Sequence, residues 1–172
     1  MRARAWGLSL LAALALAMGA PLSALANADE AALKAAIAYN LMLFTQWPDE
    51  ATWPVGAPLV LCADPGSRWW PALRQLQDRP VRLARLSVRD PGRQPDGLRA
   101  CQVLLLDGAL RGAVAGGGQL PIADEGEGVR GWVIRLGRQG ERLVFDIDLQ
   151  AARGLNLQVS SKALRLAREV RE

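Results

Sequence analysis

Two short runs of mostly apolar residues constrain the fold of this chain more than any other feature. Residues 58–63 read PLVLCA and residues 101–106 read CQVLLL, and each run has the length of a strand. Gly56 and Pro65 bound the first run, and the turn-forming segment DPGRQPDG precedes the second. Strands that are buried on both faces show continuous apolar runs, whereas half-exposed strands alternate. The pattern therefore favours a parallel sheet that is covered on both sides.

The rest of the chain alternates helical and strand patterns. Helical spacing is expected over residues 33–44, 68–77, 109–114 and 161–170, and strand patterns over 81–86, 120–123, 132–136 and 142–149. The last two strands flank Gly137–Gly140 (GRQG), which is typical of an antiparallel hairpin. We predict a single three-layer α/β/α domain with a mixed, mainly parallel sheet and a C-terminal hairpin plus helix.

The first helix has a simple expected boundary and core face. Leu33, Ile37, Leu41 and Phe44 recur at helical spacing, so they are expected to form one buried stripe. Asp29 is the expected N-cap, and Pro48 prevents the helix from continuing. In the last helix, Ser160 or Ser161 is the expected cap, with Ala163, Leu166, Ala167 and Val170 on the buried face.

Residues 1–26 have the features of a secretory signal peptide. Arg2 and Arg4 precede an apolar stretch over residues 8–20, and Ala24-Leu25-Ala26 offers a small-x-small cleavage site. Cleavage is expected after Ala26, with Ala28 as the alternative. The apolar stretch is shorter than the roughly 20 residues that span a bilayer. We therefore expect an exported, periplasmic protein whose mature domain covers residues 27–172.

Charge and composition argue against several functional classes. Without Arg2 and Arg4 the chain has 19 basic and 17 acidic residues, a net charge of +2, and its arginines are scattered. Nucleic-acid binding would favour a basic stripe with interleaved aromatics. The sequence contains no histidine, so it lacks the commonest general base and metal ligand. We expect neither an enzyme, a metal site nor a cofactor.

Three patterns that resemble catalytic motifs have simpler interpretations. Gly126–Gly131 matches GxGxxG, but it leads into a strand instead of a helix, so a glycine loop is the better interpretation. Ser161-Lys162 lacks the one-turn spacing of serine–lysine hydrolases, and helix capping explains the serines. Asp146 and Asp148 could bind a cation or serve acid–base chemistry, but the solvated face of a strand predicts the same alternation.

The two cysteines, Cys62 and Cys101, predict one disulfide in an exported chain. Two buried free thiols are the alternative. Cys62 ends its expected strand and Cys101 begins its own, which places them at opposite ends of adjacent parallel strands. A disulfide needs Cα atoms within about 7 Å, so either the strands are staggered or the bond forms only after a shift.

Tryptophan is the dominant aromatic residue of the chain. Trp47 lies at the expected helix exit, where it can half-bury. Neighbouring residues of a helix diverge by about 100°, so Trp69 and Trp70 cannot both face inward. Exposed tryptophans are frequent anchors of protein interfaces. One of this pair is therefore expected to contact a partner.

Several motifs together resemble the YfiR-like family of small periplasmic regulators (domain of unknown function 4154). They are FTQWP at residues 44–48, LVLCAD at 59–64, CQVLLLD at 101–107 and FDIDLQAARGLNLQVSSKALRLAREV at 145–170. Their order and spacing across some 140 residues make the resemblance specific. It implies an exported, non-enzymatic regulator that holds the periplasmic domain of an inner-membrane diguanylate cyclase inactive.

On this resemblance, we expect the partner surface to include Trp47, Trp69, Trp70 and the loop that carries Arg130 and Trp132. A sensor kinase is another expected partner class, and the sequence leaves a homodimer open. The alternative function is a periplasmic sensor module, acting with a membrane kinase or transporter. It would bind a small hydrophobic ligand at the strand ends, where open α/β sheets usually bind ligands.

Overall fold

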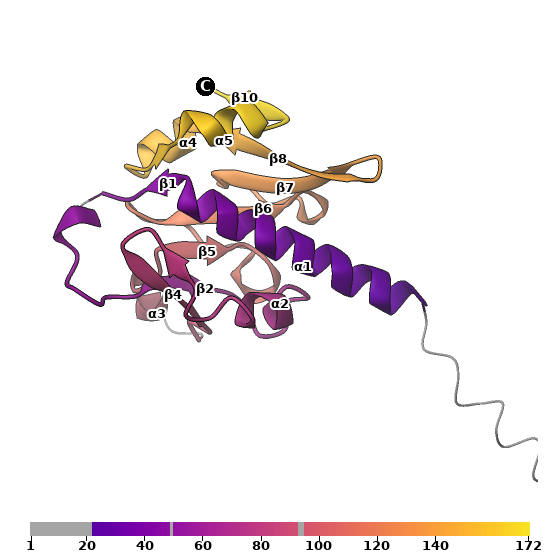
Figure 1. Cartoon of the computed structure of the whole chain (residues 1–172), viewed down its shortest axis with the longest axis horizontal. Helices are drawn as coiled ribbons and strands as arrows, with labels where there is room; N and C mark the ends of the chain where they lie inside the picture. Colours follow the sequence, from indigo (N-terminus) through magenta and orange to yellow (C-terminus); the bar gives the residue numbers. More distant parts are fainter. Residues whose placement is uncertain (1–21, 49, 93–94) are drawn as a thin grey trace, which may run out of the picture.

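The computed structural model describes residues 22–48, 50–92 and 95–172 and shows one twisted sheet with helices packed against it (Figure 1). Eight strands form the sheet in the order β10-β8-β7-β6-β5-β2-β4-β3. Their bounds are β2 Leu59–Cys62, β3 Pro80–Val81, β4 Ala84–Arg89, β5 Val103–Leu105, β6 Leu120–Asp124, β7 Ile134–Gln139, β8 Arg142–Asp148 and β10 Glu169–Arg171. A separate antiparallel pair joins β1 Thr45–Gln46 to β9 Gln158–Val159.

Helices of very different lengths accompany the sheet. The α-helices are α1 Leu22–Leu43, α2 Trp70–Arg74, α3 Pro95–Arg99, α4 Leu149–Gly154 and α5 Ser161–Leu166. Short 3₁₀ helices span Glu50–Thr52, Gly108–Leu110 and Glu125–Glu127. Strands β4, β2, β5, β6 and β7 run parallel, whereas β3 and β8 run antiparallel to their neighbours β4 and β7. The predicted mixed, mainly parallel sheet is confirmed.

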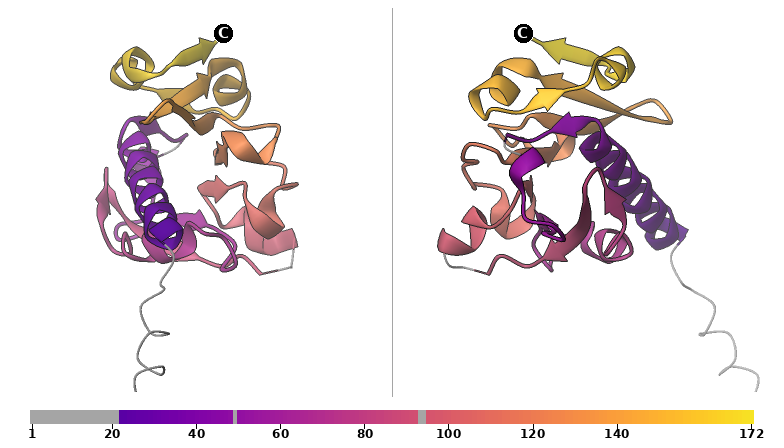
Figure 2. Two further views of the ribbon diagram at one scale, coloured as in Figure 1. Left: turned by 90° about the vertical axis from the view of Figure 1, so that its right-hand side faces the viewer. Right: turned by 60° about the vertical axis from the view of Figure 1, so that its left-hand side comes forward.

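The sheet is buried on both faces, which explains the continuous apolar runs. Helices α1 and α2 cover one face, where Leu59, Leu61 and Met42 belong to the larger core (Figures 1 and 2). The other face carries a smaller core that includes Cys62 and Leu104, with Leu98 of α3 packed against it. Strand residues therefore contribute side chains to two different cores.

The predicted boundary of the first helix needs correction, and so does one of its four predicted stripe residues, because Leu41 is buried and Ile37 and Phe44 pack against the larger core. Helix α1 begins at Leu22, so Asp29 lies inside the helix and is not its N-cap. Leu33 has 59% of its surface exposed, while Ala35, Ala38 and Met42 face the core. Small alanines let a helix pack closely on a sheet, so they occupy the inner face here in place of the larger leucine.

Three local elements also differ from the expectation. Residues 81–86 form a tight β3–β4 hairpin instead of one strand, with Arg82 in the left-handed conformation at φ 54°. Helix α2 spans only Trp70–Arg74, and the helix expected over residues 109–114 is limited to the 3₁₀ turn Gly108–Leu110. Strands β2 and β6 match their predicted positions closely.

The C-terminal region confirms the hairpin and divides the expected long helix into two elements. Gln139 pairs with Arg142, so β7 and β8 form an antiparallel hairpin. Ser160 caps α5 by accepting a hydrogen bond from the Lys162 N–H. Helix α5 ends at Leu166, which is 69% exposed and not on the buried face as predicted. Val170, predicted on the same helix, lies in strand β10.

The predicted signal segment lies mostly outside the described residues, which begin at Leu22. The bond after Ala26, where cleavage is predicted, falls within α1. Signal cleavage stays a prediction.

Candidate functional site

Trp47 and Trp69 are structural parts of the core. Trp47 is 5% exposed, and its Nε1 donates a hydrogen bond of 3.2 Å to the carbonyl of Gln102. Trp69 is fully buried directly before α2, and its Nε1 has no hydrogen-bond partner among the described residues. Both rings therefore offer little surface to a partner in this conformation.

Trp70 and Trp132 differ in their accessibility. Trp70 is half-buried beside the larger core, with the Arg74 guanidinium 5.8 Å from its ring centroid. Trp132 is only 6% exposed. The guanidinium groups of Arg135 and Arg171 lie 4.6 and 5.0 Å from the Trp132 centroid, at cation–π distance. Trp132 thus links β7 to the C-terminal strand.

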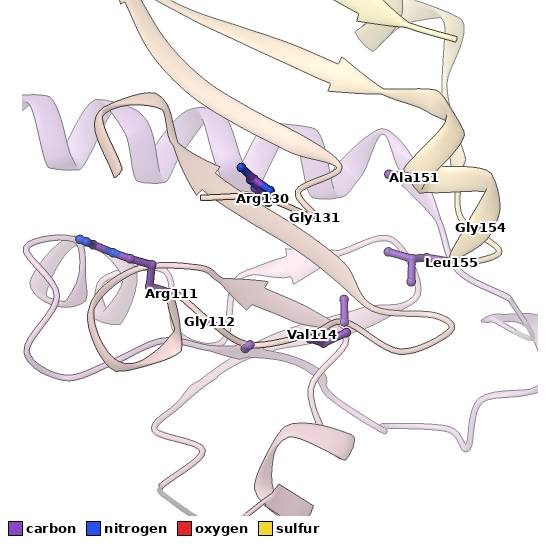
Figure 3. A pocket seen from close by; sticks show the side chains of 10 residues that line it. Arg111, Gly112, Val114, Arg130, Gly131, Ala151, Gly154 and Leu155 are labelled. Atoms are coloured by element: carbon purple, nitrogen blue, oxygen red, sulfur yellow. The ribbon is translucent and has the colours of Figure 1, made fainter. Parts of the chain in front are cut away.

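Arg130 lies on the surface, in the segment that leads into β7. It lines a cavity together with residues of the 111–115 segment and of α4 (Figure 3). Trp70 packs against the larger core, on one face of the sheet. Val129, which precedes Arg130, packs against the smaller core on the other face. The five residues expected to form one contact surface are therefore not brought together.

The predicted disulfide is confirmed between Cys62 and Cys101, whose Cα atoms lie 5.8 Å apart. Cys62 is in register with Leu104 of β5. Cys101 precedes that strand, and the chain bends at Gln102 before β5 begins at Val103. The bend, rather than a stagger of the strands, lets the two sulfurs meet on the side of the smaller core.

Charged side chains gather at the carboxyl end of β6 and join it to α1. The Lys34 ammonium is buried and lies 2.7 Å from Asp124 and 2.6 Å from Glu30. Arg68 contacts the same Asp124 oxygen at 2.9 Å. The hydrogen bond from Lys34, and to a lesser extent the one from Arg138, holds the pKa of Glu30 below its ordinary value.

Neighbouring strand ends are also internally paired. Asp64 accepts backbone hydrogen bonds from Ala109 and Gly66, which lower the pKa of Asp64. The Ser67 hydroxyl donates to Asp107 at 2.6 Å. The strand ends, where open α/β sheets usually bind ligands, therefore carry mutually bonded polar groups rather than an apolar cleft.

A second buried carboxylate holds the C-terminal region. Asp146 has no exposed surface, which corrects its expected place on a solvated strand face. It accepts hydrogen bonds from Arg135 of β7 and from Arg168, which follows α5. Burial disfavours its ionisation, but the two arginines outweigh burial and keep the pKa of Asp146 below its ordinary value. Asp148 instead caps α4 through the Ala151 N–H.

Helix α1 presents an unusual outward face. Between Glu30 and Leu43 the exposed residues are Ala32, Leu33, Ala36 and Asn40. The two charged residues of this stretch, Glu30 and Lys34, engage the network at the end of β6. Surface helices ordinarily carry charges outward, so this helix has the reverse arrangement. An uncharged helix face is typical of surfaces that contact other proteins.

Among the described residues, no group of three or more His, Cys, Asp or Glu side chains could hold a metal ion. Among the same residues, no helix is both long and apolar enough to cross a membrane.

The sequence pattern did not indicate the outward face of α1, because the predicted apolar stripe begins at Leu33, which lies on that outward face. The buried lysine was the available signal. In residues 30–44 Lys34 is the only basic residue, and it lies one turn after Glu30.

A family comparison covers most of the elements of this fold. No curated protein sequence matches the chain significantly. The family profile described as YfiR/HmsC-like (domain of unknown function 4154) matches residues 31–168, from α1 to the segment before β10. The chain therefore belongs to the YfiR/HmsC-like family, whose members are periplasmic regulators.

Proposed function

We propose that this chain is exported to the periplasm, binds the periplasmic domain of an inner-membrane diguanylate cyclase and represses it. The family match across residues 31–168 carries the proposal, because family members interact with membrane signalling proteins. A sensor kinase is the second partner class. Regulation of this kind breaks no covalent bond in the partner.

The outward face of α1 is the contact surface we favour. Leu33 is exposed on this face, and Ala32, Ala36 and Asn40 lie beside it at one-turn spacing. Small side chains let a second helix approach closely, and the lack of charge avoids a desolvation penalty on binding. The N-terminal end of α1 also extends past the sheet, so a partner can reach it (Figure 1).

We propose that Trp70 adds to this surface, because it is half-buried at the start of α2 and α2 packs against α1. Trp47 and Trp69 belong instead to the larger core that positions both helices, and Trp132 belongs to the smaller core. Arg130 lies apart from this surface, at the cavity between the 111–115 segment and α4.

Repression by binding requires a preference between two states of the cyclase. A ligand shifts an equilibrium only by its differential affinity for the two conformations. A hundredfold preference for the inactive conformation corresponds to about 2.7 kcal/mol. Contact with a single helix face can supply a difference of this size.

Affinity purification of the mature chain from detergent-solubilised membranes tests the proposal. We expect the wild-type chain to retain a diguanylate cyclase and Leu33→Glu to lose it, since the new carboxylate would be buried at the contact. Leu166→Glu is the matched control, because Leu166 is a similarly exposed leucine on α5. Retention of no membrane signalling protein by the wild type would overturn the proposed function, and equal retention by both variants would overturn the surface.

A further inference from the structure

A cavity of about 620 Å³ lies between the 111–115 segment, the residues that precede β7 and helix α4 (Figure 3). Its size falls within the range of roughly 300–1,000 Å³ that is usual for small-molecule sites. It shares no residue with the outward face of α1 or with the charged network at the end of β6. The surface proposed for the cyclase therefore does not account for it.

The lining combines cationic and apolar groups. Arg111 and Arg130 are its two charged residues, while Val114, Ala151 and Leu155 provide apolar surface. Figure 3 shows Val114, Ala151 and Leu155 gathered at one side and the two arginines at the other. Val114 is 89% exposed, so its side chain is accessible to the apolar part of a ligand.

We propose that this cavity binds a free carboxylate with an apolar body of medium-chain fatty-acid size. A guanidinium group presents paired N–H donors that match a carboxylate, so Arg130 would hold the anionic head. The alkyl chain would then cover Val114 and contact Leu155. A neutral molecule would form no charge-assisted hydrogen bond with Arg130, and a small anion would leave the apolar wall in water.

Glycines around the cavity keep it open. A Cβ atom added at Gly154 would meet no atom within 4 Å, and Gly112 is equally unobstructed. Gly154 lies in α4, where a larger side chain suits the helical backbone. Gly154→Leu would therefore fill the cavity without straining the backbone, which makes it a sharp test.

Isothermal titration of the mature chain with decanoate, below its micelle-forming concentration, tests the proposal. We expect decanoate to bind at least about tenfold more tightly than 1-decanol, because the alcohol lacks the charge-assisted hydrogen bonds. Acetate, which has the head group alone, should not bind measurably. Arg130→Gln should weaken decanoate binding about tenfold or more, and Gly154→Leu should abolish it.

Arg142→Gln is the matched control, because Arg142 is exposed on the β7–β8 hairpin and does not line the cavity. It should bind decanoate as the wild type does. Absence of decanoate binding, or binding that survives both cavity variants, would overturn the proposal. If the chain instead sediments with phosphatidylglycerol vesicles, and Arg130→Gln prevents this, then Arg130 binds a lipid surface and not a free carboxylate. Each result is independent of whether the chain binds a cyclase.

Discussion

Asp146 is the residue whose burial and pairing most directly predict a loss of stability. Its carboxylate joins Arg135 of β7 to Arg168 beyond α5 and has no exposed surface. Asp146→Asn would leave two guanidinium groups without their anionic partner. Removing one partner of a buried ion pair costs about 3–5 kcal/mol, and the partial exposure of both arginines places the expected loss near ~3 kcal/mol.

Urea unfolding of the mature domain measures this loss. Glu141→Gln is the control, because Glu141 is 99% exposed and its 3.5 Å contact with Arg138 lies at the surface. The control should change the free energy of unfolding by less than about 1 kcal/mol. Equal losses of unfolding free energy from the two substitutions would show that Asp146 contributes no more stability than a surface ion pair does.

The same carboxylates predict how stability depends on pH. The pKa values of Glu30, Asp64 and Asp146 are lower in the folded protein than their ordinary values of 4.5, 3.8 and 3.8. A lowered folded pKa adds stability that is present above the ordinary value and is lost as pH falls through the folded pKa. The free energy of unfolding should therefore fall as pH drops below about 4.

Measuring the free energy of unfolding by urea titration from pH 7 to pH 2 checks this prediction. Asp146→Asn should reduce the acid slope, because one of the three shifted groups no longer titrates. With no histidine in the chain, no side chain of that type should add a slope between pH 5 and 8. A slope that Asp146→Asn leaves unchanged would assign the acid response to other groups.

At the scale of elements, the disulfide joins β2 to the bend before β5. It closes a loop with a sequence separation of 39 residues. On the chain-entropy model such a loop stabilises the fold by about 4 kcal/mol. The double substitution Cys62→Ala and Cys101→Ala should lower the free energy of unfolding by about this amount in a urea titration. Dithiothreitol should destabilise the wild type and leave the double variant unchanged, whereas a response of the double variant would point to another cause.

The elements also show where sequence reasoning succeeds and where it fails. Continuous apolar runs located β2 and β5, and glycine turn residues located the β7–β8 hairpin, because each of these signals is local. The exposure of Leu33 and the burial of Lys34 on α1 could not be predicted, since the ion pair between Lys34 and Asp124 spans 90 residues. Strand β10 was missed for the same reason, because Arg168 is positioned by Asp146 on a distant strand.

At the scale of the whole molecule, the fold class and family could be predicted from the sequence, but the surface could not. The tryptophans were expected at a contact because of their type, yet Trp47, Trp69 and Trp132 are buried. Burial depends on which segments the fold brings together, and a single sequence does not state this. The uncharged face of α1 and the cavity beside Arg130 are products of tertiary packing.

Our proposal that the chain represses a membrane cyclase through the outward face of α1 can be tested inside the cell. The most direct measurement is the intracellular concentration of cyclic-di-GMP in a strain that lacks the chain and is complemented with its variants. We predict that deletion raises the concentration, that Leu166→Glu restores the lower value, and that Leu33→Glu fails to restore it although the protein is exported and folded. Unchanged cyclic-di-GMP on deletion, or full restoration by Leu33→Glu, would contradict the account.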